Sequence, residues 1–205
     1  HKLPIILNTA YATYKENFGG QIGFVSVDPK SGKLALAFQI HMPGFDYDLA
    51  RPGKGPSHGW AFFTNYNTEQ ANTLKERNAS QFDKDYITAV NWKQAEQCVA
   101  AGKAKTWPTK YAHNWVDEAD VAHSEMLTSE KVLEPADCPG MIYFIPTPKS
   151  PHGVDVDPSG EYIVGGGKLA TVIPVHSFTK MQKAIADKAF EKEIAGIPVL
   201  KYEAV

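Results

Sequence analysis

Short apolar runs separated by turn residues dominate the chain, which is the pattern of β-strands rather than of long helices. Near the N-terminus, two strand-like segments flank a turn-like one and read QIGFVSV (21–27), DPKSG (28–32) and KLALAFQI (33–40). Proline presets φ and glycine accepts a positive φ, so the middle segment predicts a tight turn. The three segments together predict a β-hairpin.

The same plan returns further along the chain. HGVDV (152–156), DPSG (157–160) and EYIVGG (161–166) predict a second hairpin, and ATVIPV (170–175) predicts a third strand beside it. Between the two hairpins, HGWAFFTNY and DYITAVN have the composition of an outgoing and a returning strand.

Two predicted strands continue into helices. WKQAEQCVAAGKA (92–104) follows Asn91, a suitable N-cap, and Gly102 predicts the end of this helix. TKMQKAIADKAFEKEIAG (179–196) predicts the second helix, capped by Ser177 or Thr179. Its apolar stripe is expected to pack against a sheet and consists of Phe178, Met181, Ile185 and Ala189.

The order strand, turn, strand, strand, helix therefore occurs twice, about 85 residues apart. Repeated units of this kind favour the blades of a β-propeller. Two blades cannot close a ring, and their outer edges would remain unpaired. The pattern thus predicts a mainly β chain that forms part of a larger closed structure.

Composition narrows the function classes. Lysine and arginine number 21 against 23 acidic residues, which argues against binding to nucleic acid or to a membrane surface. No apolar segment approaches the roughly 20 residues that a membrane span needs. Cys98 and Cys138 form no CxxC pair; a disulfide in an oxidising compartment is one interpretation, and buried free thiols are the one we favour.

The 7 histidines include no HxH or HxxxH pair, so local spacing reveals no complete metal site. His152 lies between Pro151 and Gly153 at the start of a predicted strand. It is either a turn residue without a task or one ligand of a site whose other ligands lie elsewhere. His41 and His58 flank a long loop and are weaker candidates to line a site.

Three segments carry a family resemblance: GWAFFTNYNTEQANTL (59–74), DYITAVNWKQAEQCVAAGKAKTWP (85–108) and SPHGVDVDPSGEYIVGGGKLATVIPVHSF (150–178). In this order and spacing they resemble nitrous-oxide reductase, and the resemblance runs from about Phe24 onward. It implies a seven-bladed propeller that carries a four-copper sulfide cluster, followed by a cupredoxin domain with a binuclear copper centre. Residues 1–205 would then be roughly two blades with long loops, without the cupredoxin domain through which electrons enter.

The resemblance assigns His152 as a copper ligand and a catalytic residue, because the family has a cluster histidine in a Pro-His-Gly element. Proline restricts the backbone there, glycine permits a close approach, and neutral imidazole suits copper. A calcium site beside the cluster is also implied, and oxygen donors suit that ion. Its residues would be Tyr66, Glu69, Asp85 with Asp83 as the alternative, a backbone oxygen near Arg77, and Ser150 where the family commonly has Asn. Without the resemblance, Tyr66 and Glu69 read as a packed aromatic beside an acidic residue in the first turn of a helix.

The function implied is the reduction of nitrous oxide to N2 and water in the periplasm by a homodimer. A cytochrome c or a cupredoxin would donate the electrons, and no nucleic acid or membrane would take part. This chain alone lacks the family's His-His pair and its Cys-rich copper loop, so activity is expected of the parent enzyme only. The alternative is a non-enzymatic β-propeller that serves as a binding platform.

Overall fold

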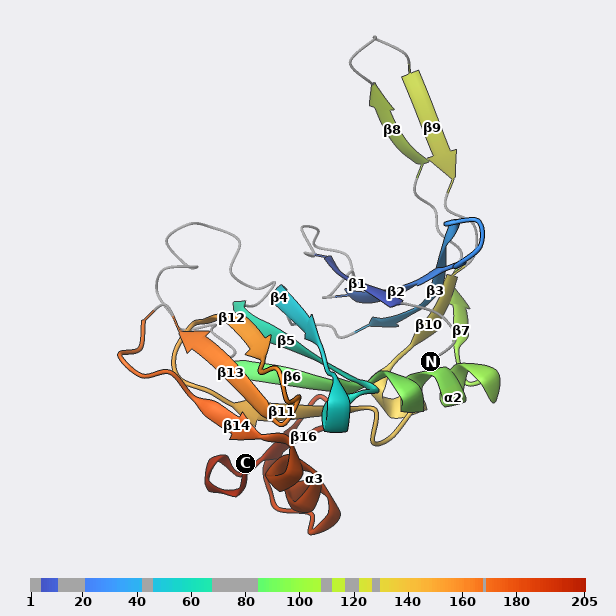
Figure 1. The fold of residues 1–205 in the computed structure, drawn as a ribbon. Coiled ribbons are helices and arrows are strands. Elements are labelled where there is room, and N and C mark those ends of the chain that lie inside the picture. The colour runs from blue at the N-terminus through green and yellow to red at the C-terminus, as the bar shows by residue number, and fades with distance from the viewer. Residues whose placement is uncertain are drawn as a thin grey trace.

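The computed structural model of the chain describes residues 5–10, 21–41, 46–67, 85–107, 112–116, 122–126, 130–167 and 169–205. Within these ranges the chain is mainly β, as the sequence predicts: four sheets are accompanied by two α-helices and three short 3-10 helices (Figure 1).

The strands form sheets of five, six, three and two strands, in which neighbours in the orders below are hydrogen-bonded. The five-stranded sheet consists of β1 (Ile5–Ala10), β2 (Gln21–Val27), β3 (Leu34–His41), β10 (Glu130–Leu133) and β7 (Lys105–Trp107). The six-stranded sheet consists of β15 (Phe190–Ile194), β16 (Ile197–Leu200), β11 (Ile142–Pro146), β6 (Tyr86–Asn91), β5 (Trp60–Asn67) and β4 (Asp46–Pro52). The three-stranded sheet consists of β12 (Pro151–Val156), β13 (Tyr162–Gly167) and β14 (Val175–Ser177). The remaining elements are the hairpin β8 (Ala112–Val116) and β9 (Ala122–Met126), and the helices α2 (Trp92–Ala100), α3 (Phe178–Ala186), η1 (Gly55–Ser57), η2 (Pro135–Asp137) and η3 (Tyr202–Ala204).

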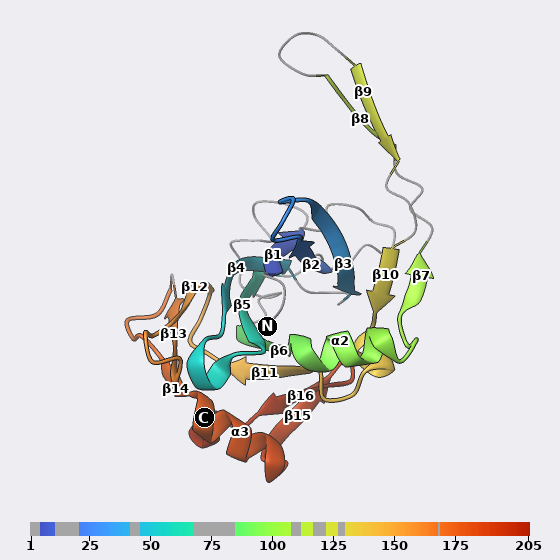
Figure 2. The ribbon, with the colours of Figure 1, turned by 45° about the vertical axis from the view of Figure 1, so that its right-hand side comes forward.

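The six-stranded sheet is buried on both faces. Phe63 and Phe144 belong to a core shared with β2 and β3 of the five-stranded sheet. Phe62 and Ile145, one residue away on the same strands, belong to a second core shared with β12, β13 and α3. Successive side chains of a strand point to opposite faces, so a strand covered on both faces reads as a continuous apolar run. The β8–β9 hairpin projects away from these layers in both views (Figures 1 and 2).

Both predicted hairpins are confirmed, and the turn chemistry explains them. In the first, the Asp28 carboxylate accepts hydrogen bonds from the Lys30 amide at 2.9 Å and from the Ser31 hydroxyl at 2.7 Å. In the second, the Asp157 carboxylate accepts from the Tyr162 amide at 2.9 Å and from Ser159. These bonds lower the pKa of Asp157 to about 2, because they favour its charged form.

The expected equivalence of the two repeated units is wrong at the level of strand pairing. β2 and β3 pair within the five-stranded sheet, whereas β5 and β6 pair within the six-stranded sheet. The second unit does form one sheet, β12-β13-β14, followed by α3. Its third strand was predicted at 170–175 but begins only at Val175. Pro174 has no amide proton to donate to a ladder, and Val175 is the first residue to pair, with Val164. The described strands do not form a closed ring of blades.

The second predicted helix is half as long as expected. α3 ends at Ala186. Two residues later Lys188 adopts a left-handed conformation, with a φ of 53°, so the chain no longer follows the helix. The rest of the predicted helix is β15, joined to β16 by Ala195 and Gly196, whose φ angles are 51° and 77°. Two successive positive φ angles characterise the two-residue turns of β-hairpins.

The helix caps follow the sequence closely. Asn91 caps α2 by accepting from the Gln94 amide at 3.1 Å. Of the two candidates for α3, Ser177 is the cap, because its hydroxyl accepts from the Lys180 amide at 3.1 Å.

Cys98 and Cys138 form a disulfide, so the expectation of free thiols is wrong. The pair connects α2 to the segment after η2, and its Cα atoms lie 6.0 Å apart, a usual separation for a disulfide. Both residues are buried in the core between the two larger sheets. The two cysteines are 40 positions apart in the sequence, so no local signal indicated this proximity.

Candidate functional site

Three strand ends meet where the predicted site residues lie. β5 ends at Asn67 and β6 begins at Tyr86, and the two strands pair with Asn65 opposite Tyr86. The start of β12 contacts β5 at the same end. We call this place the strand-end corner and define it by Thr64, Asp85, Ser150 and His152.

Asp85 fixes the turn that leads into β12. Its carboxylate oxygen Oδ1 accepts a hydrogen bond from the Ser150 amide at 2.6 Å, and its main-chain oxygen accepts from the Thr147 amide at 3.2 Å. A hydrogen bond to a charged carboxylate is short and strong. Ser150 is buried and has a φ of 56°, a left-handed conformation that is uncommon for a residue with a side chain. The Asp85 carboxylate thus holds a backbone conformation that is unfavourable by itself.

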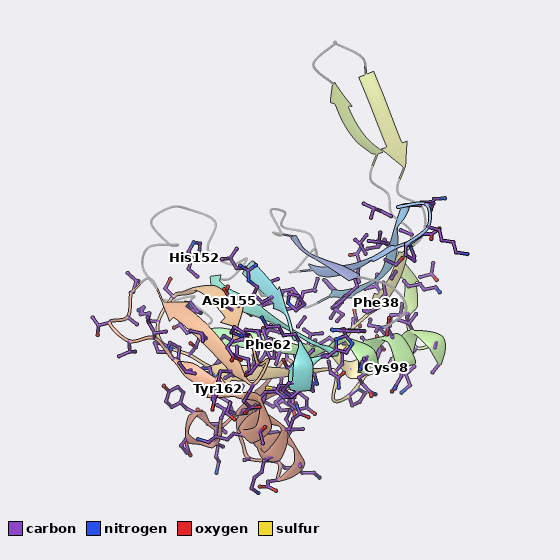
Figure 3. The ribbon with its side chains drawn as sticks, viewed as in Figure 1. Phe38, Phe62, Cys98, His152, Asp155 and Tyr162 are labelled. Atoms are coloured by element: carbon purple, nitrogen blue, oxygen red, sulfur yellow. A yellow bond between two sulfur atoms is a disulfide. The ribbon has the colours of Figure 1, made fainter. Side chains whose placement is uncertain are left out.

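His152 occupies a β-bulge. Pro151 lies opposite Gly167 and Gly153 lies opposite Gly166, so the register shifts at the residue between them. A bulge bends a strand and changes the direction in which a side chain points, and bulges are frequent beside active sites. The His152 side chain is exposed, and Figure 3 shows it above β12, away from the core residue Phe62.

Thr64 links three strands at the corner. Its hydroxyl donates to the main-chain oxygen of His152 at 3.1 Å and accepts from the Leu49 amide at 3.2 Å. The residue is fully buried within β5. Sequence reasoning missed it; the available signal was a single threonine in the apolar run WAFFT. A further link between β4 and β12 is an exposed ion pair, in which Arg51 Nε lies 3.1 Å from Asp155 Oδ1.

The structure brings some of the predicted metal ligands together and does not describe others. Asp85 and Ser150 are in direct contact, and His152 follows two residues later. The backbone of Tyr66 belongs to β5, but its side chain lies outside the described part of the chain, as do the whole of Glu69, Arg77 and Asp83. Among the described residues, no group of three or more His, Cys, Asp or Glu side chains is placed to hold a metal ion. The copper and calcium ligand roles therefore stay predictions.

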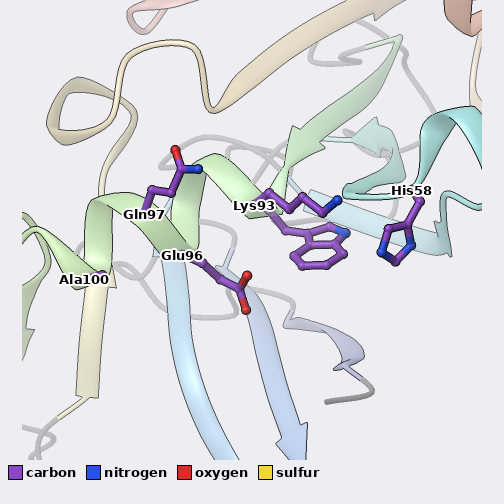
Figure 4. A pocket seen from close by; sticks show the side chains of 6 residues that line it. His58, Lys93, Glu96, Gln97 and Ala100 are labelled. Carbon is purple, nitrogen blue, oxygen red and sulfur yellow. The ribbon is translucent and has the colours of Figure 1, made fainter. Parts of the chain in front are cut away.

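The two weaker histidine candidates lie elsewhere. His41, buried at the end of β3, has Nδ1 3.7 Å from Glu134 Oε1. His58 lines an open pocket of about 520 Å³ along α2, which Figure 4 shows with Lys93, Glu96, Gln97 and Ala100. Burial raises the pKa of Glu96 in this pocket. The pocket shares no residue with the strand-end corner.

Comparison with known proteins gives one relevant similarity. No family model matches the chain. Over 156 residues the chain is 24% identical to the nitrous-oxide reductase of Pseudomonas fluorescens. The aligned region covers 76% of this chain and 21% of that protein. The chain thus spans about a fifth of the length of this relative. In the parts of the chain that the structure describes, no helix is both long enough and apolar enough to cross a membrane.

Proposed function

We propose that this chain is part of the copper-cluster domain of a nitrous-oxide reductase. The whole protein would reduce nitrous oxide to N2 and water. The observation that carries the proposal is the similarity to the nitrous-oxide reductase of Pseudomonas fluorescens over 156 residues. The segments on which the resemblance rests include the strands of the strand-end corner. The finer proposal for the fold is that these residues become part of a seven-bladed propeller in the complete protein.

His152 is proposed as one copper ligand of that domain. An exposed imidazole on a bulge suits a site whose other ligands come from elsewhere in the protein. Neutral imidazole is a good donor for copper. The cluster, when bound, supplies the redox chemistry. The chain's own contribution is to hold the backbone at and before His152: Asp85 accepts a hydrogen bond from the Ser150 amide, and Thr64 donates one to the His152 carbonyl oxygen.

A calcium ion beside the cluster is proposed on the chemistry of the donors. Asp85 supplies a carboxylate and Ser150 a hydroxyl and a carbonyl oxygen within one hydrogen-bonded turn, and hard cations prefer such oxygens. Tyr66, Glu69 and the backbone near Arg77 would complete the site, with Asp83 as the alternative to Asp85. Calcium at this position would stabilise the same turn that precedes His152.

The cellular setting of the whole protein is also part of the proposal. A periplasmic location is supported by the Cys98–Cys138 disulfide, since disulfides persist in oxidising compartments. A cytochrome c or a cupredoxin would deliver electrons to a binuclear copper centre in another domain, and a homodimer would bring that centre to the cluster.

The test uses the full-length protein, produced together with its copper-maturation machinery. Consumption of nitrous oxide with a chemical reductant and copper per chain are measured for the wild type, for His152→Ala and for the control His58→Ala. We expect His152→Ala to lose activity and copper together, while the control retains both. A wild-type protein that binds no copper would support the non-enzymatic binding platform instead. Unchanged copper and activity in His152→Ala would remove this residue from the ligand set.

A further inference from the structure

The main chain at His152 is held from the side by a residue outside its own sheet. β12 pairs with β13, but the register shift at His152 interrupts that ladder. At this point the Thr64 hydroxyl of β5 lies 3.1 Å from the His152 carbonyl oxygen. The contact joins residues 88 positions apart in the sequence and connects the three-stranded sheet to the six-stranded sheet.

The Thr64 hydroxyl must donate in this hydrogen bond, because a carbonyl oxygen has no proton, and a second contact of the same hydroxyl is compatible with that direction. A threonine hydroxyl carries one proton and two lone pairs. Because Thr64 Oγ1 accepts from the Leu49 amide at 3.2 Å, its own proton is available for the His152 oxygen. A chain of two hydrogen bonds therefore runs from β4 through β5 to β12, and such bonds strengthen one another in a low-dielectric interior. Thr64 is fully buried, and buried side chains are closely packed, so its position is well defined.

The geometry points to Thr64 as a positioning residue for the His152 imidazole. This inference rests on the proposed function, in which His152 binds copper. A metal ligand performs best when groups behind it fix its orientation, and loss of such a group typically costs 10-fold to 100-fold in metal affinity or activity. Such support normally comes from a bond to the second ring nitrogen. Here Thr64 acts through the backbone, by fixing the bulge from which the side chain projects.

Three variants separate this role from a general loss of stability. Thr64→Val keeps the shape of the side chain and removes the hydroxyl, whereas Thr64→Ser keeps the hydroxyl. Thr88→Val is the matched control: Thr88 is also fully buried, on the paired strand β6, and its hydroxyl donates to Asn65 Oδ1 at 2.7 Å. Thr88 and Thr64 lie on opposite faces of the six-stranded sheet. Thr88 shares its face with Val90, two residues along β6, which belongs to the core with the five-stranded sheet. Thr64 shares its face with Phe62, two residues back along β5, which belongs to the other core.

The first measurement needs no metal. In the 205-residue chain, NMR chemical shifts of the His152 ring and the Gly153 amide are compared among the variants. Thr64→Val is expected to move both signals, Thr64→Ser to restore them, and Thr88→Val to leave them at the wild-type positions. Wild-type shifts in Thr64→Val would overturn the inference whatever the protein's function is.

The second measurement uses the copper-loaded full-length protein. The chelator concentration that removes half of the copper should fall about 10-fold or more in Thr64→Val, with a changed visible absorption spectrum. It should stay near the wild-type value in Thr64→Ser and Thr88→Val. If His152→Ala loses copper but Thr64→Val behaves like Thr88→Val, the inference fails and the proposed function stands. If His152→Ala keeps its copper and spectrum, His152 is not a copper ligand, and the positioning role of Thr64 falls with it. A wild-type protein that binds no copper would overturn the proposed function itself.

Discussion

Acidification is expected to destabilise the protein through one buried imidazole, that of His176 on β14. Its side chain is 2% exposed, and within the described residues its Nε2 atom has no hydrogen-bond partner. The ring meets Tyr202 edge-on, with the ring centroids 6.1 Å apart. Desolvation by burial lowers the pKa of His176 from 6.5 to about 4, because the charged ring loses the water that would solvate it.

The sign and the size of the effect follow from linkage. Between about pH 4 and pH 6.5 the unfolded chain binds a proton at His176 and the folded chain does not. The contribution of His176 to the free energy of unfolding is therefore fully present above about pH 6.5 and is lost as the pH falls towards 4. Below about pH 4 both states bind the proton, and this group causes no further loss. A pKa difference of one corresponds to about 1.4 kcal/mol, so the total loss in the free energy of unfolding is about 3 kcal/mol.

Urea unfolding of the chain at several pH values between 7 and 4 tests this prediction. His176→Phe keeps a planar ring and removes the titrating group, so the wild-type-minus-variant difference should change by about 3 kcal/mol across the window. Met181→Leu changes a buried residue that does not titrate, so it should change the free energy of unfolding by the same amount at every pH. A parallel pH dependence in His176→Phe and wild type would refute the reasoning, as would an NMR titration that places the His176 pKa at 6 or above.

Two further predictions concern stability. Replacement of both Cys98 and Cys138 by alanine should lower the free energy of unfolding by about 2–4 kcal/mol, because the disulfide closes a 40-residue loop; an unchanged urea midpoint under reductant would contradict this. Gly160→Ala should be far more destabilising than Gly32→Ala when both are measured by thermal unfolding. Both glycines have a positive φ, of 79° and 70°, but an added Cβ at Gly160 would lie 1.9 Å from the Lys54 carbonyl oxygen, whereas at Gly32 it meets nothing within 4 Å. Equal losses would show that the contact between Gly160 and Lys54 is absent.

The sequence predicted those elements whose signal is local. Hairpin turns were predictable because Asp, Pro and Gly act within a few residues, and the cap at Asn91 for the same reason. The end of α3 was not, since Phe190 and Ile194, four residues apart, fit one face of a helix as well as one face of a strand. The disulfide and the distribution of the strands over two sheets depend on contacts between distant segments.

The candidate site shows the same division. The resemblance placed Asp85 and Ser150 in a calcium site and His152 in a copper site beside it, and the structure shows that Asp85 contacts Ser150 directly. For Thr64 the sequence offers only a single threonine in the apolar run WAFFT, which does not reveal its role, because its hydrogen-bond partners are 15 and 88 residues away. Its detection required the relative placement of β4, β5 and β12.

The central claim is that the His152 imidazole binds copper in the complete protein, and a crystal structure of that protein tests it most directly. Diffraction data recorded on both sides of the copper absorption edge locate copper independently of any other ion. The account predicts an anomalous peak at bonding distance from a ring nitrogen of His152. A fully copper-loaded protein whose anomalous peaks all lie away from this ring would contradict it.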